Sequence, residues 1–191
     1  MKVLYRGSKQ SGLKVMEPRL VNHDKPYVYA TPYKLEALIY SISGGNFTYT
    51  NVIQCYDDGT AELIERVPDV FKNKFMKVEG RIYHLFGDTF YLHEEEGVGN
   101  HEYVSDVPVS VIEEEVIPDV WEYYKDMERQ GILKIYLYPN RPNWIPKDDS
   151  DLIECAEIGY KQGIDGAYDM LLKYHPHLKD RVRRLYNERK R

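Results

Sequence analysis

Short apolar runs and alternations bounded by turn residues dominate the first two thirds of the chain, and this pattern predicts β-strands. Asp57-Asp58-Gly59 and Gly87-Asp88 are tight-turn sequences, so the strands on either side of each are expected to form a hairpin. The stretch 103–111, with its alternating valines, is expected to pair back onto the same sheet. The predicted strands are Val3–Tyr5, Tyr27–Ala30, Asn51–Tyr56, Thr60–Val67, Gly80–Phe86, Thr89–His93, Tyr103–Val111 and Ile132–Tyr138.

Two helices are predicted between these strands. The first follows Thr31 and Pro32, which are an N-cap hydroxyl and a proline at the first helical position. Gly44 is the expected end of this helix, because glycine readily adopts the left-handed conformation that closes helices. The second helix opens at Pro118 and ends at Gly131.

The last quarter of the chain has helical periodicity. Asp151, with Glu154 three positions later, predicts a capping box at the start of this region. The expected helices are Leu152–Lys161, Ala167–Tyr174 and Leu178–Asn187. The fold class is therefore α+β, with a mostly antiparallel (split) β-sheet core, flanking helices and a helical C-terminal tail. We expect residues 1–145 to form this core domain and residues 146–191 to form a helical extension packed on it.

Composition indicates an ordinary globular protein. The 191 residues are 42% hydrophobic and 30% charged, and no apolar run is long enough to span a bilayer. At the N-terminus the apolar stretch after Lys2 is already interrupted by the charged Arg6, whereas a signal peptide has a longer apolar run. The two cysteines, Cys55 and Cys155, are expected to be reduced core thiols. These features predict a cytoplasmic protein with no membrane partner.

Charge is unevenly distributed along the chain. Residues 177–191 hold seven basic and two acidic side chains, a net charge of +5, so a total of −5 leaves −10 for the remainder. A basic terminal helix could contact nucleic acid or an anionic surface, although lysines and arginines also favour the C-terminal end of their own helix. The acidic remainder repels phosphate, which argues against a general nucleic-acid-binding protein.

Searches for common catalytic and metal-binding motifs find no phosphate loop, GxGxxG, GxSxG, HExxH or paired CxxC sequence. His175 and His177 flank a proline and could face one metal ion, but we expect an ordinary surface pair and predict no metal site. The runs Glu94–Glu96 and Glu113–Glu115 lack the ligand spacing of a calcium loop, so they are expected to be solvated.

Three short segments carry the candidate chemistry. In the first, Arg6 and Gly7 place a cation beside bare backbone, which suits a phosphate or an amide, although an edge strand would have the same residues. In the second, Tyr27 and Tyr29 share one strand face and could stack a planar ring, or could simply pack as most of the 18 tyrosines must. In the third, Glu102 stands at the start of a strand after a glycine-rich loop.

In this order, the three segments resemble the ADP-ribosyltransferase-like superfamily. Its members commonly carry a histidine or arginine at the end of the first core strand, an aromatic or Ser-x-Ser strand, and a glutamate that opens a later strand. The resemblance covers residues 1–45 and 98–118, about a third of the chain. It implies that NAD is a possible substrate, that the nicotinamide–ribose bond is cleaved, and that no metal is needed.

The resemblance also implies roles in binding NAD. Arg6 would contact a phosphate or ribose of the dinucleotide, and the backbone of Gly7 would bind the nicotinamide carboxamide. Tyr29, or Tyr27 on the same face, would stack on nicotinamide. Thr31 would order the site through a hydrogen bond.

Glu102 is the implied catalytic carboxylate, with Tyr29 and Arg6 completing the catalytic set. Glu102 would hold the ribose 2′-hydroxyl and stabilise the oxocarbenium-like cation as nicotinamide leaves. A fixed negative charge favours such a transition state more than the neutral ground state of the ribose.

The sequence departs from the superfamily's patterns at several positions. The resemblance therefore does not decide whether the acceptor of the ADP-ribosyl group is a protein or a nucleic acid. Ala30-Thr31-Pro32 stands where arginine-type members carry Ser-x-Ser/Thr, and Asn100 stands where many arginine-modifying members carry a glutamate or glutamine. Members with a His-Tyr-Glu pattern carry histidine at the first position. The alternative is a catalytically silent protein-interaction or structural protein with the same type of fold. A third possibility is a relative of the tRNA 2′-phosphotransferases.

Overall fold

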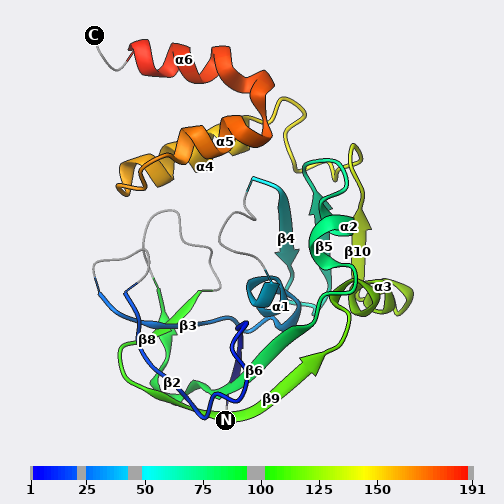
Figure 1. Cartoon of the computed structure of the whole chain (residues 1–191), viewed down its shortest axis with the longest axis vertical. Helices are drawn as coiled ribbons and strands as arrows, with labels where there is room; N and C mark the ends of the chain where they lie inside the picture. Colours follow the sequence, from blue (N-terminus) through cyan, green and yellow to red (C-terminus); the bar gives the residue numbers. More distant parts are fainter. Residues whose placement is uncertain (1, 21–24, 43–48, 94–101, 189–191) are drawn as a thin grey trace. The chain divides into compact units, whose positions relative to one another are not determined.

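The computed structural model describes residues 2–20, 25–42, 49–93 and 102–188, which fold as an α+β protein (Figure 1). The strands are β1 (Val3–Gly7), β2 (Val15–Met16), β3 (Val28–Ala30), β4 (Asn51–Cys55), β5 (Ala61–Glu65), β6 (Gly80–Phe86), β7 (Tyr91–Leu92), β8 (Tyr103–Ser105), β9 (Val109–Ile117) and β10 (Leu133–Tyr136). The α-helices are α1 (Lys34–Ile42), α2 (Val70–Phe75), α3 (Val120–Arg129), α4 (Ser150–Lys161), α5 (Ala167–Tyr174) and α6 (Lys179–Glu188). Two short 3₁₀ helices are η1 (Gly87–Thr89) and η2 (Pro176–Leu178).

The strands in the described residues form three small sheets with the orders β1-β6-β9-β2, β10-β5-β4 and β3-β8-β7. The predicted hairpin around Asp57-Asp58-Gly59 is confirmed, because β4 and β5 are neighbours. Gly59 has φ of +86°, the left-handed conformation that such a turn uses.

Two predictions of strand pairing are wrong. β7 pairs with β8 and not with β6, because η1 redirects the chain at Gly87, whose N–H donates to the carbonyl of Lys2 at 2.8 Å. The expected single strand 103–111 is two strands, β8 and β9, which belong to different sheets. Pro108 lies between them and has no N–H for a sheet ladder, and the hydroxyl of Ser105 donates to the carbonyl of Val107 at 3.0 Å.

The chain divides into two compact units, and the first comprises Met1–Gly44, Ile53–Leu63 and Phe71–Ile135. In this unit α1 lies against β1 and β6 (Figure 1). The expected end of α1 at Gly44 lies outside the described residues, and the helix is described as far as Ile42. The core between β1, β3, β6 and the start of β9 is made by buried apolar side chains from these strands and β2: Leu4, Met16, Val28, Ala30, Tyr83, Leu85 and Val109.

The second unit comprises Gly45–Val52, Ile64–Val70 and Tyr136–Arg191. It contains α4, α5 and α6, coloured yellow to red in Figure 1. Its core is formed by Tyr49 together with apolar side chains from these helices and from η2. The helical residues of this core are Leu152, Ile153, Ala156, Tyr168, Leu171, Leu178 and Val182.

Helix starts are only partly as predicted. Asp119 caps α3 by accepting hydrogen bonds from the N–H groups of Trp121 and Glu122, and Gly131 closes this region with φ of +74°. The capping box predicted at Asp151 is wrong, since Asp149 precedes α4 with φ of +55° and makes no side-chain cap. The Asp151 carboxylate instead accepts a hydrogen bond from Arg66, which is 85 positions earlier in the sequence. Among the described residues, every helix falls short of the length and apolar character needed to cross a membrane.

Candidate functional site

The three candidate segments lie side by side in the first unit. β1 meets β3 at a bridge in which Tyr5 and Thr31 exchange two backbone hydrogen bonds of 2.8 and 2.9 Å. β3 in turn pairs with β8, with Ala30 opposite Tyr103. Thr31 and Glu102 are the next positions beyond that pair. The fold therefore brings the first two segments next to each other, and the third next to the second.

Arg6 lies at the end of β1, beside β3. Its Nη1 donates to the carbonyl oxygen of Tyr29 at 3.0 Å. Because side chains alternate between the two faces of a strand, the Arg6 side chain leaves β1 on the same face as Leu4 and not on the face of Tyr5. The carbonyl oxygen of Tyr29 lies in the plane of the sheet, so the hydrogen bond to it holds the guanidinium level with β3. Burial, followed by the charge of Arg19, lowers the pKa of Arg6.

Gly7 is required by the close approach of α1. A Cβ atom at this position would overlap with the carbonyl oxygen of Ala37 and would lie 2.6 Å from the backbone nitrogen of Ser41. This contact explains the glycine through helix–strand packing, without a ligand.

Aromatic rings gather at the start of β3. The rings of Tyr27 and Tyr29 are 6.1 Å apart at an interplanar angle of 82°, and those of Tyr27 and His93 are 5.5 Å apart at 83°. Both tyrosines are half-buried, whereas Val28 between them is buried, so the predicted alternation is confirmed. The backbone N–H of His93 donates to the carbonyl of Glu102 at 2.9 Å, which links this cluster to the third segment.

Thr31 and α1 contribute hydroxyl and carboxylate groups. The Thr31 hydroxyl donates to Oε2 of Glu36 at 2.5 Å and accepts from the N–H of Tyr33 at 3.2 Å. Burial raises the pKa of Tyr40, and the negative charges of Glu36 and Glu102 raise it further. The Tyr40 hydroxyl is therefore close enough to both carboxylates to sense their charge.

Sequence reasoning missed Arg19, Glu36 and Tyr40. Arg19 is an exposed residue that exchanges two backbone hydrogen bonds with Tyr27, of 3.0 and 3.1 Å, and no local pattern marks it. Glu36 and Tyr40 are four positions apart and so share one face of α1. That spacing, together with the position of the helix directly after Thr31, was a signal that could have identified them.

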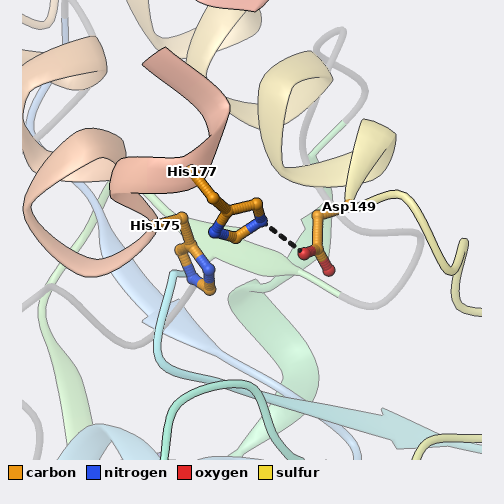
Figure 2. Close-up of side chains that lie close together, drawn as sticks. All are labelled: Asp149, His175 and His177. Carbon is orange, nitrogen blue, oxygen red and sulfur yellow. Dashed lines mark hydrogen bonds and ion pairs between the residues drawn. The ribbon is translucent and has the colours of Figure 1, made fainter.

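A second group of ionisable side chains lies in the second unit (Figure 2). One donor atom each from Asp149, His175 and His177 lies within 4.8 Å of the others. Nε2 of His177 is 3.0 Å from Oδ2 of Asp149, and Nε2 of His175 is 2.6 Å from the carbonyl of Tyr49. The expected surface pair of histidines is wrong for His175, which is 4% exposed. Burial lowers the pKa of His175, which favours its neutral form.

Two arginines surround the carboxylate of Asp149. Arg66 Nη2 and Arg141 Nη1 donate to Oδ1 at 3.0 and 2.7 Å. Burial alone would raise the pKa of Asp149, but the hydrogen bonds from Arg141 and Arg66 outweigh it and lower the pKa. Arg66 also makes a two-pronged pair with Asp151, with nitrogen–oxygen distances of 2.6 and 3.1 Å.

The run 113–115 is not simply solvated. Glu114 accepts from the N–H of Gly12 at 2.9 Å, and Glu115 pairs with Lys34 at 2.6 Å and with His84 at 3.2 Å. The run 94–96 lies outside the described residues.

Searches with the whole chain find no matching protein-family model, curated protein or solved structure.

Proposed function

We propose that the first unit binds NAD and cleaves the bond between nicotinamide and ribose, as an ADP-ribosyltransferase-like enzyme. The observation that carries this proposal is the adjacency of β1, β3 and the start of β8, which brings Arg6, Tyr29, Thr31 and Glu102, up to 96 residues apart in sequence, onto neighbouring stretches of backbone. These are the residues to which the resemblance gives roles in binding and catalysis.

The distribution of charge around β3 supports the proposal. Arg6 and Arg19 lie near enough for the charge of one to lower the pKa of the other, and such a pair suits the diphosphate of a dinucleotide. Glu36 and Glu102 form the negative region near Tyr40. The nicotinamide ring of NAD is cationic while its diphosphate is anionic. A site with one positive and one negative region matches this ligand.

Glu102 is the proposed catalytic group. In the reaction the bond between ribose C1′ and the nicotinamide nitrogen breaks, and its electron pair leaves with nicotinamide. The ribose becomes oxocarbenium-like until the oxygen or nitrogen of an acceptor, or water, forms a bond to C1′ and releases a proton. A carboxylate fixed near this centre stabilises the positive charge as it develops.

A catalytically silent interaction protein is the alternative, and two observations favour it. Arg6 and Thr31 already have partners within the fold, in the carbonyl of Tyr29 and the carboxylate of Glu36. Val3 and Phe86 lie directly opposite each other on β1 and β6 and are 38% and 40% exposed, as in a surface that receives a partner.

The test is to titrate NAD into the purified full-length chain while following thermal unfolding and the release of free nicotinamide. We expect stabilisation by NAD and slow release of nicotinamide. Glu102→Gln should retain the stabilisation and lose the release, because the amide is similar in size but carries no charge. Glu17→Gln, at an exposed glutamate outside the candidate site, is the matched control and should behave as the unmodified chain does.

Arg6→Lys tests the phosphate contact. Lysine keeps a donor for Tyr29 but has no fork for a phosphate, so we expect weaker stabilisation by NAD with unchanged stability of the free protein. No stabilisation at millimolar NAD, or release that is equal in Glu102→Gln, would overturn the proposed function. Stabilisation without release from any variant would favour the silent alternative.

A further inference from the structure

The group formed by Asp149, His175 and His177 converges from three elements of the second unit. Asp149 directly precedes α4, His175 follows α5, and His177 belongs to η2 (Figure 2). Their donor atoms are within 4.8 Å of one another. Donors around a tetrahedral zinc ion are roughly 3.3 Å apart, from bond lengths of about 2.0–2.1 Å. Closing the group around an ion therefore needs side-chain movements of about an ångström, and His177 is 59% exposed and able to rotate.

We propose that Asp149, His175 and His177 bind a divalent transition-metal ion of the zinc class. Two imidazoles and one carboxylate are the ligands that zinc accepts, whereas magnesium and calcium prefer oxygen donors only. Three protein ligands leave a fourth position of a tetrahedral zinc ion open for water or another small ligand.

His175 is oriented as metal-binding histidines generally are. A ligating imidazole usually donates its second N–H to a carbonyl or carboxylate, which fixes the tautomer. At His175 the acceptor is the carbonyl of Tyr49, 2.6 Å from Nε2, so the proton is placed on Nε2 and Nδ1 keeps its lone pair. The side chain is almost fully buried, so the surrounding residues hold the ring in this orientation.

The carboxylate of Asp149 is also held in place, by hydrogen bonds to one of its two oxygens. Both arginine contacts, from Arg66 and Arg141, are to Oδ1, while Oδ2 faces His177. Ligating carboxylates are commonly fixed by such hydrogen bonds. The two guanidinium charges are balanced by Asp149 and Asp151, so the surroundings are neutral before an ion binds. An ion that relies on charge alone gains little here, and one that bonds to imidazole nitrogen is favoured.

The test is calorimetric titration of zinc into the full chain after removal of metals with a chelator and exchange into chelator-free buffer. We expect one zinc ion to bind per chain, and the affinity for zinc to fall about tenfold or more in His177→Ala. Because the His177 side chain is exposed, this variant should still fold. His84→Ala is the matched control, because His84 lies in the first unit beside Glu113 and Glu115 and would report adventitious binding. This variant should bind zinc as the unmodified chain does.

Cobalt provides a second readout, because its absorption spectrum reports on the ligands as well as on binding. Cobalt bound by two imidazoles and a carboxylate should give visible absorption bands, and these should be lost in His177→Ala and in Asp149→Asn but kept in His84→Ala. Magnesium at the same concentration should produce no heat of binding. Zinc binding that is unchanged in His177→Ala, or no binding at millimolar zinc, would overturn the proposal.

Discussion

Gly7 of β1 lies directly against the carbonyl oxygen of Ala37 in α1, and the space between them cannot hold a methyl group. Ser41, one turn further along α1, closes the same space with its backbone nitrogen at 2.6 Å from an added Cβ. The obstacles are backbone atoms, which cannot turn aside as a flexible side chain can. Helix and strand must separate if any side chain is placed here.

Gly7→Ala is therefore expected to destabilise the first unit. Overpacking of a buried contact costs about 1–3 kcal/mol, and backbone obstacles place this case at the upper end. Urea unfolding followed by far-ultraviolet circular dichroism measures the change. A midpoint equal to that of the unmodified chain would mean that α1 and β1 are not held at this distance.

Gly159→Ala is the control for a glycine without such a contact. Gly159 lies within helix α4, and a Cβ atom added to it would be 3.5 Å from the Cβ of Ala167, which is an ordinary contact distance. Alanine is favoured over glycine inside helices by about 0.5–1 kcal/mol. We expect this variant to be at least as stable as the unmodified chain, so Gly7→Ala should lower the urea midpoint and Gly159→Ala should not.

Arg66→Ala should strongly destabilise the second unit. The Arg66 side chain is 2% exposed and pairs with Asp149 and Asp151, so its removal leaves two carboxylates without this partner. Breaking a buried ion pair from one side costs about 3–5 kcal/mol. Arg129→Ala removes an exposed pair with Asp126, 63% exposed on the arginine side, and should cost less than about 0.5 kcal/mol. Equal losses in both variants would contradict this difference.

Local signals predicted much of the secondary structure. The turn at 57–59, the helix that ends before Gly131 and the helix Ala167–Tyr174 each depend on residues close in sequence, and each is found. Pairing partners were predicted less well, because β-sheet neighbours are chosen by contacts between distant residues. The pairing of β7 with β8 follows from the η1 turn and the tie between Gly87 and Lys2, which the turn sequence alone does not reveal.

The same distinction applies to the candidate sites. Alternation was enough to place Tyr27 and Tyr29 on one face, since it depends only on positions within one strand. The burial of His175 and the role of Asp151 were missed because they depend on partners far away. Asp151 looks like a helix cap beside its own helix, but Arg66, 85 positions earlier, binds its carboxylate.

The two cysteines should differ in reactivity. Burial raises the pKa of Cys55 to about 12, so almost none of this thiol is ionised at pH 8. Cys155 is exposed, contrary to the expectation of two core thiols, although partial burial raises its pKa as well. An aromatic disulfide reagent should release one equivalent of chromophore from the folded chain and two after unfolding. Cys155→Ser should abolish the first equivalent, and a reaction that persists would place an accessible thiol at Cys55.

His175 should make the second unit less stable in mild acid. Burial lowers its pKa below the ordinary value of about 6.5, and Arg66 and His177 act in the same direction, while Tyr49 and Asp149 oppose them. The unfolded chain therefore binds a proton more readily than the folded chain. The resulting contribution to stability is fully present above about pH 6.5 and is lost as the pH falls toward the lowered pKa.

The measurement is the urea midpoint at pH 7.5, 6.5 and 5.5 (about one unit on either side of the ordinary histidine pKa), with a chelator present so that bound metal does not contribute. Other groups also titrate over this range, so the comparison is with His175→Gln, whose amide can still donate to the carbonyl of Tyr49. The unmodified chain should lose more stability than this variant between pH 7.5 and 5.5. Parallel losses would mean that His175 titrates alike in the folded and unfolded chain, and its burial would then have no consequence for protonation.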